Sequence, residues 1–98
     1  MAFIVIYYPE AEKEFFEAYN WYEERSLGLG KRFEGSVGKR IDDILINPES
    51  YPNKEVNVRE ATITDFPYLI VYKIFPVDEI ILIISIFHTS RLPGKKYR

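Results

Sequence analysis

FPYLIVYKIFPVDEIILIISIFH, residues 66–88, decides the fold of this chain. It contains two runs, 66–75 and 80–88, that are apolar at almost every position and are joined by the short turn PVDE. Such continuous apolar runs are typical of strands that are covered on both faces. Pro67 cannot donate to a ladder, so it belongs at a strand start or edge. The stretch therefore predicts two central strands paired about a turn.

The segments on either side of this stretch add two more strands. EVNVREATIT (55–64) alternates between apolar and polar residues, as a strand does. Its alternation slips between Val58 and Ala61, which predicts a bulge near Arg59 and Glu60. FIVIYY (3–8) is β-branched and aromatic and predicts a first strand.

Between the first strand and residue 47 the apolar period is that of a helix. Pro9 suits a first helical position, and the glycine-rich SLGLG (26–30) ends one helix and turns the chain into the next, which stops at Asn47-Pro48. The two helices, over 10–25 and from residue 29, form an antiparallel hairpin. Their apolar stripes are Ala11, Phe15, Ala18, Tyr19 and Tyr22 in the first, and Leu29, Phe33, Val37, Ile41, Ile44 and Leu45 in the second.

The order β-α-α-β-β-β is that of a small α+β domain. We expect the helical hairpin to pack on one face of a mostly antiparallel, four-stranded sheet. The length of 98 residues fits one domain over 1–98, with a basic tail at 91–98.

Composition excludes several classes of protein. The chain has no cysteine, which excludes a disulfide scaffold and a thiolate metal site. Its longest apolar run is far too short to span a membrane, and its N-terminus lacks the features of a signal peptide. We find no metal-ligand spacing, phosphate loop or nucleophile elbow, so no cofactor and no metal are expected. These features favour a cytoplasmic protein.

The charge of the chain is unevenly distributed. The net charge is −2, but residues 88–98 carry four cations and no acid, so the preceding residues carry −6. An acidic protein does not coat nucleic acid. The tail residues Arg91, Lys95, Lys96, Tyr97 and Arg98 are therefore candidates for binding an acidic partner.

His88 is the only histidine and follows the last strand. It could act as a general acid or base, contact a partner, or hold the strand end by a hydrogen bond to a backbone carbonyl. Trp21 and Phe16 lie off the main stripe of the first helix, so they either widen it or form an exposed patch for a partner. Lys31 and Arg32 begin the second helix, where the dipole disfavours cations, which hints at a binding role.

Taken in order, several short motifs are similar to those of the ParE branch of the RelE/ParE toxin superfamily. They are Gly28-Leu29-Gly30 with Phe33, Asn47-Pro48 with Tyr51-Pro52, Phe66-Pro67-Tyr68 with Tyr72, and His88 with Arg91 and Pro93. The resemblance covers nearly the whole chain. It implies a toxin of a type II toxin–antitoxin system, often labelled a plasmid stabilisation protein, that a cognate antitoxin holds inactive.

The resemblance leaves two kinds of target. RelE-like toxins are endonucleases that cleave messenger RNA on the ribosome, whereas ParE-like toxins poison DNA gyrase without an established catalytic act. In the RelE-like case His88, Arg91 and Arg59 are the candidate catalytic residues. In either case Trp21 and the tail residues are candidates for contacting the partner. A degenerate toxin that only binds antitoxin is a third alternative.

The residues favour binding over catalysis. If the strands pair about their turns, Arg59 and His88 lie four or five residues apart along the sheet, roughly 15 Å. A catalytic pair needs hydrogen-bond reach or one intervening water. An acidic chain is also a poor binder of ribosomal RNA. We therefore expect a toxin that binds DNA gyrase.

Overall fold

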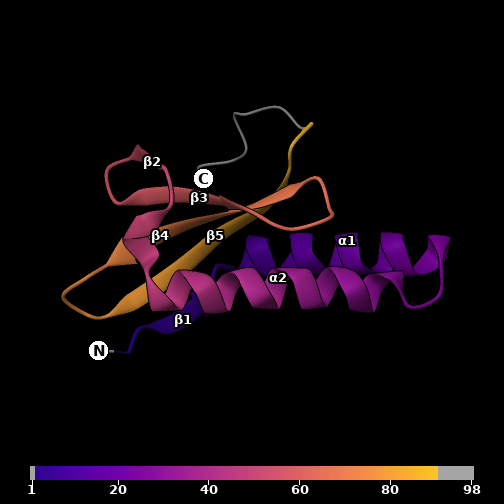
Figure 1. The fold of residues 1–98 in the computed structure, drawn as a ribbon, viewed down its shortest axis with the longest axis horizontal. Coiled ribbons are helices and arrows are strands. Elements are labelled where there is room, and N and C mark those ends of the chain that lie inside the picture. Colours follow the sequence, from indigo (N-terminus) through magenta and orange to yellow (C-terminus); the bar gives the residue numbers. More distant parts are fainter. Residues whose placement is uncertain (1, 91–98) are drawn as a thin grey trace.

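The computed structural model describes residues 2–90 (Figure 1). The predicted basic tail at 91–98 lies outside these residues. Along the chain the elements are β1 (Ile4–Tyr7), α1 (Pro9–Arg25), α2 (Leu29–Ile46), the short 3-10 helix η1 (Pro48–Ser50), β2 (Asn53–Glu55), β3 (Val58–Thr62), β4 (Tyr68–Phe75) and β5 (Ile80–His88).

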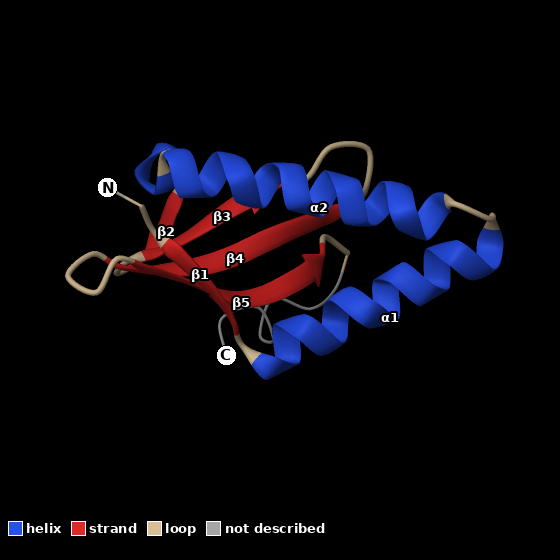
Figure 2. Ribbon diagram, turned by 90° about the horizontal axis from the view of Figure 1, so that it is seen from below, coloured by secondary structure: helices blue, strands red, loops and turns tan. Residues whose placement is uncertain are grey.

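The five strands form one sheet in the order β1-β5-β4-β3-β2. β1 runs parallel to β5, and every other neighbouring pair is antiparallel. Both helices lie on one face of the sheet, where α1 packs against α2 and β5 (Figure 2). The predicted α+β class, helical hairpin and mostly antiparallel sheet are thus confirmed.

The predicted number of strands was too low by one. The segment 55–64 is not one strand, because a turn at Val56 and Asn57 separates β2 from β3. Asn57 adopts a left-handed φ of 61°, which asparagine tolerates better than most residues. Polar and apolar residues continue to alternate through this turn, so the periodicity of the sequence does not reveal the turn.

The predicted bulge near Arg59 and Glu60 was also wrong. β3 pairs with β4 without interruption from Val58 to Thr62. Register shifts lie in two other strands instead. In β2 one falls between Asn53 and Glu55, whose partners are Arg59 and Val58, and in β5 the partners of Val71 and Tyr72 are Ser85 and Ile83, so Ile84 is skipped. Val58 and Ala61 are both buried because they face different clusters on the two sides of the sheet, not because the strand is bulged.

The main core lies between the helices and the sheet, and a smaller cluster lies on the other face. In the main core Phe33 is fully buried, and Tyr72 is the largest fully buried side chain. The smaller cluster is formed by Val58, Val71 and Ile84. Side chains on both faces of the central strands are therefore buried, but among the described elements only the two helices cover a face, because the second cluster consists of strand residues alone. Among the described residues, no helix is long and apolar enough to cross a membrane.

The turn between the helices is held by a carboxylate of the first helix. Gly28 has a φ of 88°, and Glu23 accepts hydrogen bonds from the backbone nitrogens of Gly28 (2.8 Å) and Gly30 (2.9 Å). Glu23 thereby supplies negative charge at the N-terminus of α2, where free amides and the helix dipole favour an anion. The Glu23 carboxylate also offsets the unfavourable position of the cations Lys31 and Arg32 at the start of α2.

Tyr72 ties β4 to the loop after α2, since its hydroxyl donates to the Pro48 carbonyl at 2.5 Å. Burial raises the pKa of Tyr72 above its ordinary value. The folded protein therefore keeps this proton at a pH where the unfolded chain loses it. The stabilisation is complete below about pH 10 and falls above it, by up to about 1.4 kcal/mol per pH unit.

We expect Tyr72→Phe to flatten this alkaline loss of stability. At pH 8 the variant should be less stable by about 1 kcal/mol, because the Pro48 carbonyl loses its donor. Urea unfolding of both proteins between pH 8 and pH 11 measures the two slopes. Tyr7 and Tyr22, whose pKa values are also raised by burial, leave a residual slope in both proteins. Identical slopes would contradict the assignment to Tyr72.

Candidate functional site

His88 lies at the end of β5, paired with Tyr68 of β4. The two rings meet edge to face, with their centroids 4.9 Å apart. The backbone nitrogen of Ser90 donates to His88 Nδ1 at 3.1 Å, and Ser90 Oγ lies 2.7 Å from the same atom. Because an amide can only donate, Nδ1 is an acceptor, and the neutral ring carries its proton on Nε2. The backbone partner of Nδ1 is an amide, whereas the structural alternative considered for His88 was a hydrogen bond to a backbone carbonyl.

His88 opens onto a pocket of about 480 Å³ between α1 and the ends of the central strands. Its walls include two carboxylates and several rings: Glu14, Glu17, Trp21, Tyr22, Tyr68 and His88. The structure thus brings together Trp21 and His88, which the sequence offered as separate candidates. Within residues 2–90, no lysine or arginine lines this pocket.

Glu14 joins the pocket to the irregular part of β5. One oxygen, Oε1, accepts hydrogen bonds from Ser85 Oγ and from the backbone nitrogen of Ile86, both at 3.0 Å. These contacts fix the carboxylate at the junction of α1 and β5. Glu14 and Glu17 were not predicted as site residues. Their spacing with Trp21 puts all three on one side of the helix, but only the packing of α1 shows which strand end they reach.

Trp21 and Phe16 are both exposed, as one of the two predicted alternatives required, but they line different hollows. Trp21 is 50% exposed, and the Arg25 guanidinium lies 3.6 Å from the centre of its ring. Phe16 is 57% exposed and lines an apolar groove of about 320 Å³ with Phe15 and Val37. The helical lining of this groove comes from the first half of α1 and the middle of α2. The two helices diverge from their common turn (Figure 2).

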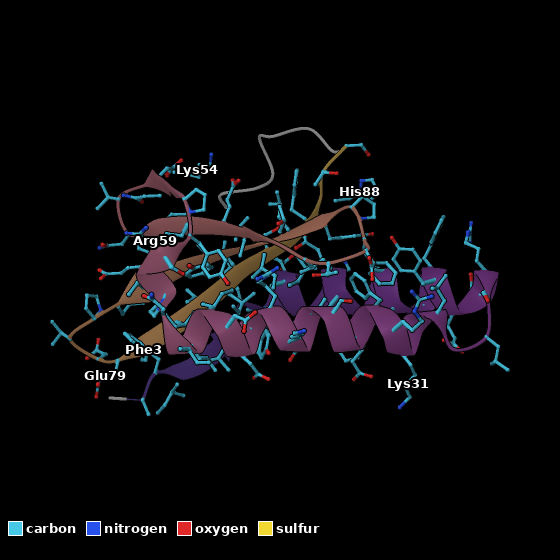
Figure 3. All side chains as sticks on the ribbon, viewed as in Figure 1. Phe3, Lys31, Lys54, Arg59, Glu79 and His88 are labelled. Atoms are coloured by element: carbon cyan, nitrogen blue, oxygen red, sulfur yellow. The ribbon has the colours of Figure 1, made fainter. Side chains whose placement is uncertain are left out.

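Arg59 is held far from His88. Arg59 pairs with Tyr72 and His88 with Tyr68, so the two levels are four residues apart along β4, about 13 Å. Figure 3 shows Arg59 near Lys54, well separated from His88. The guanidinium donates to the carbonyls of Glu49 (3.1 Å) and Tyr51 (2.7 Å), so it supports the loop before β2. The geometry does not bring Arg59 and His88 into one site.

The remaining candidates, Arg91, Lys95, Lys96, Tyr97 and Arg98, lie outside the described residues. In the part of the chain that the structure describes, no group of three or more His, Asp or Glu side chains is arranged to hold a metal ion. The described site therefore consists of a histidine whose Nδ1 accepts a hydrogen bond, two carboxylates and a wall of aromatic rings.

The fold matches known toxin structures. One is a chromosomal ParDE toxin–antitoxin system from P. aeruginosa, with a TM-score of 0.71 and 14% identity, which covers 91% of this chain and 98% of that chain. A second is a variant of the E. coli toxin RelE in complex with an antitoxin RelBc peptide (TM-score 0.65, 18% identity, 93% and 87% covered). A third is the isolated E. coli RelE toxin (TM-score 0.65, 17% identity, 97% and 93% covered).

A comparison with curated proteins gave no match. A family model does match, over residues 5–93, and its description is the ParE toxin of the type II toxin–antitoxin system parDE. The match includes both helices, all five strands and the site around His88. Only the first residue of β1 lies outside it. The chain therefore belongs to the ParE toxin family of type II toxin–antitoxin systems.

Proposed function

We propose that this protein is held inactive by a cognate antitoxin and that, once released, it acts by binding and poisoning DNA gyrase. Family membership supports the antitoxin partner, as does the RelE structure that contains an antitoxin peptide. The binding mode of action rests on the surroundings of His88. The choice of gyrase rests on charge and on the family branch.

The proposal rests on the charge of the residues that surround His88. Cleavage of RNA without a metal ion requires cations that stabilise negative charge on the phosphate in the transition state. The described lining of the pocket instead supplies the carboxylates of Glu14 and Glu17. Arg59, the candidate cation within the described residues, donates to two loop carbonyls away from the pocket. These carboxylates would repel a phosphate beside His88.

The charge of the rest of the molecule favours a protein target over ribosomal RNA. α1 presents the exposed acids Glu10, Glu12, Glu17 and Glu24. Affinity for RNA depends strongly on cations that neutralise phosphates, and a surface of this sign opposes it. The alternative of an mRNA endonuclease keeps some support from the fold shared with RelE, and a toxin that only binds antitoxin is the third candidate.

Induction of the gene without antitoxin tests the three alternatives. We expect growth arrest with a DNA-damage response, inhibition of gyrase supercoiling by the purified protein, and recovery of growth when the cognate antitoxin is co-expressed. Translation arrest with cleaved transcripts would support the endonuclease instead. Normal growth with intact antitoxin binding would leave only the third alternative.

Replacement of His88 tests whether its imidazole is required for toxicity. We expect His88→Gln, which keeps a polar side chain that can accept a hydrogen bond, to retain toxicity within about two-fold. Loss of a general acid or base typically lowers a rate by about 10²- to 10⁴-fold. Thr89→Ala, at the exposed neighbouring position, is the matched control. Growth curves under graded induction provide the measurement. A loss of toxicity in a folded His88→Gln protein that still binds antitoxin would contradict this expectation and would support catalysis or a direct target contact by His88.

A further inference from the structure

The pocket beside His88 combines negative charge with aromatic walls, a combination that the proposed function does not use. We propose that this pocket binds the guanidinium group of an arginine side chain carried by a partner protein. The inference goes beyond the proposed function, because it concerns one recognition contact and holds whichever target the toxin has.

Glu17 gives the described lining of the pocket a negative charge that attracts a cation. Glu14 and Glu17 are three residues apart on α1, so their side chains lie on neighbouring positions of the helix surface. Glu14 is fixed by Ser85 and Ile86, whereas Glu17 is exposed and forms no ion pair within residues 2–90. One carboxylate is thus held in place and the other is able to adjust to an incoming group.

The walls select a flat cation over a compact one. Neighbouring ring centroids are 5.2 Å apart for Trp21 and Tyr22, 6.2 Å for Tyr22 and Tyr68, and 4.9 Å for Tyr68 and His88. These four rings form a continuous aromatic wall on which a planar guanidinium can stack. Within the chain itself, Arg25 already places its guanidinium 3.6 Å from the centre of the Trp21 ring.

The shape of the pocket admits a side chain from another molecule. Ala18 lies on the same side of α1, between Glu14 and Trp21, and its small side chain leaves the hollow open. The volume of about 480 Å³ exceeds that of a guanidinium group, so the aliphatic stem of an arginine and part of its backbone also fit. A phosphate or an acidic side chain would face the two carboxylates and be repelled.

The probe is N-acetyl-arginine methylamide, titrated into the full-length ¹⁵N-labelled protein and followed by NMR. We expect millimolar binding with shifts at the Trp21 indole N–H and at the amides of His88 and Ser90. The citrulline analogue has nearly the same shape without the charge and should bind at least about ten-fold more weakly. Equal binding of the citrulline analogue, tighter binding of N-acetyl-glutamate methylamide, or no shift at these residues would overturn the proposal.

A pair of variants tests the charge directly. Glu17→Gln should weaken binding of the arginine probe by about three-fold, the usual effect of a partly exposed ion pair. Glu24→Gln removes the same charge from an exposed position of α1 outside the pocket and should leave the affinity unchanged. Matching thermal unfolding curves establish that both variants are folded. An equal effect of the two substitutions would overturn the proposal in favour of general attraction by the acidic helix, without bearing on toxicity.

Discussion

Phe33→Ala will destabilise the protein by about 3–5 kcal/mol, the usual cost of emptying a buried aromatic site. Phe33 is fully buried where α2 meets α1 and the sheet. Its ring centroid lies 5.1–5.7 Å from those of four other rings: Phe15, Tyr22, Phe66 and Tyr68. These belong to α1, to β4 and to the loop before β4, so one truncation loosens three parts of the fold.

Urea denaturation followed by far-UV circular dichroism measures this cost. Native domains have a total stability of about 5–15 kcal/mol, so this loss is a large fraction of the total. Leu27→Ala is the matched control, because Leu27 is 95% exposed and its truncation should change stability by less than about 0.5 kcal/mol. A Phe33→Ala protein as stable as the control would show that the ring cluster is not the centre of the core.

Gly30→Ala will cost about 2 kcal/mol, although alanine normally stabilises a helix relative to glycine. A Cβ at Gly30 would lie 2.8 Å from the carbonyl oxygen of Tyr19 and 2.9 Å from Glu23 Oε1. The first atom belongs to the backbone and cannot move aside without shifting α1. The second belongs to the carboxylate that caps α2. The substitution therefore separates the helices at their turn and displaces the cap.

Gly35→Ala, five residues further along α2, is the control that isolates this contact. A Cβ at Gly35 meets nothing within 4 Å, so alanine there should stabilise the protein by about 0.5–1 kcal/mol. Thermal unfolding should place the melting temperatures of the two variants on opposite sides of the wild type. If both substitutions raised the melting temperature, close packing at Gly30 would be refuted.

The helices and central strands could be predicted from the sequence because each has a clear period and clear ends. Pro9, the glycines of the turn and Asn47-Pro48 mark boundaries of α1 and α2 within one residue of those observed. The turn at Val56 and Asn57 was missed because apolar alternation continues through it. The irregularity in β5 was missed because an apolar run without polar positions does not show where a residue is skipped.

The candidate site was only partly predictable. His88 and Trp21 stood out individually as the only residues of their types. Their meeting depends on how α1 lies across β5, and Glu14 contacts residues 71 and 72 positions away in the chain. The separation of Arg59 from His88 could be estimated beforehand, because strand register follows from turn positions, and the structure gives a similar value. Long-range packing of a helix leaves no comparable signature in a single sequence.

The position of β5 inside the sheet has a consequence for folding during translation. β5 is the last described element to be synthesised, yet it lies between β1 and β4 and pairs with both. Until residues 80–88 have emerged, β1 has no neighbour in the sheet, and α1 has no strand to pack on at Glu14. A translation product that stops before residue 80 lacks the centre of the sheet. Any toxicity that depends on this fold therefore requires that residues 80–88 have been synthesised.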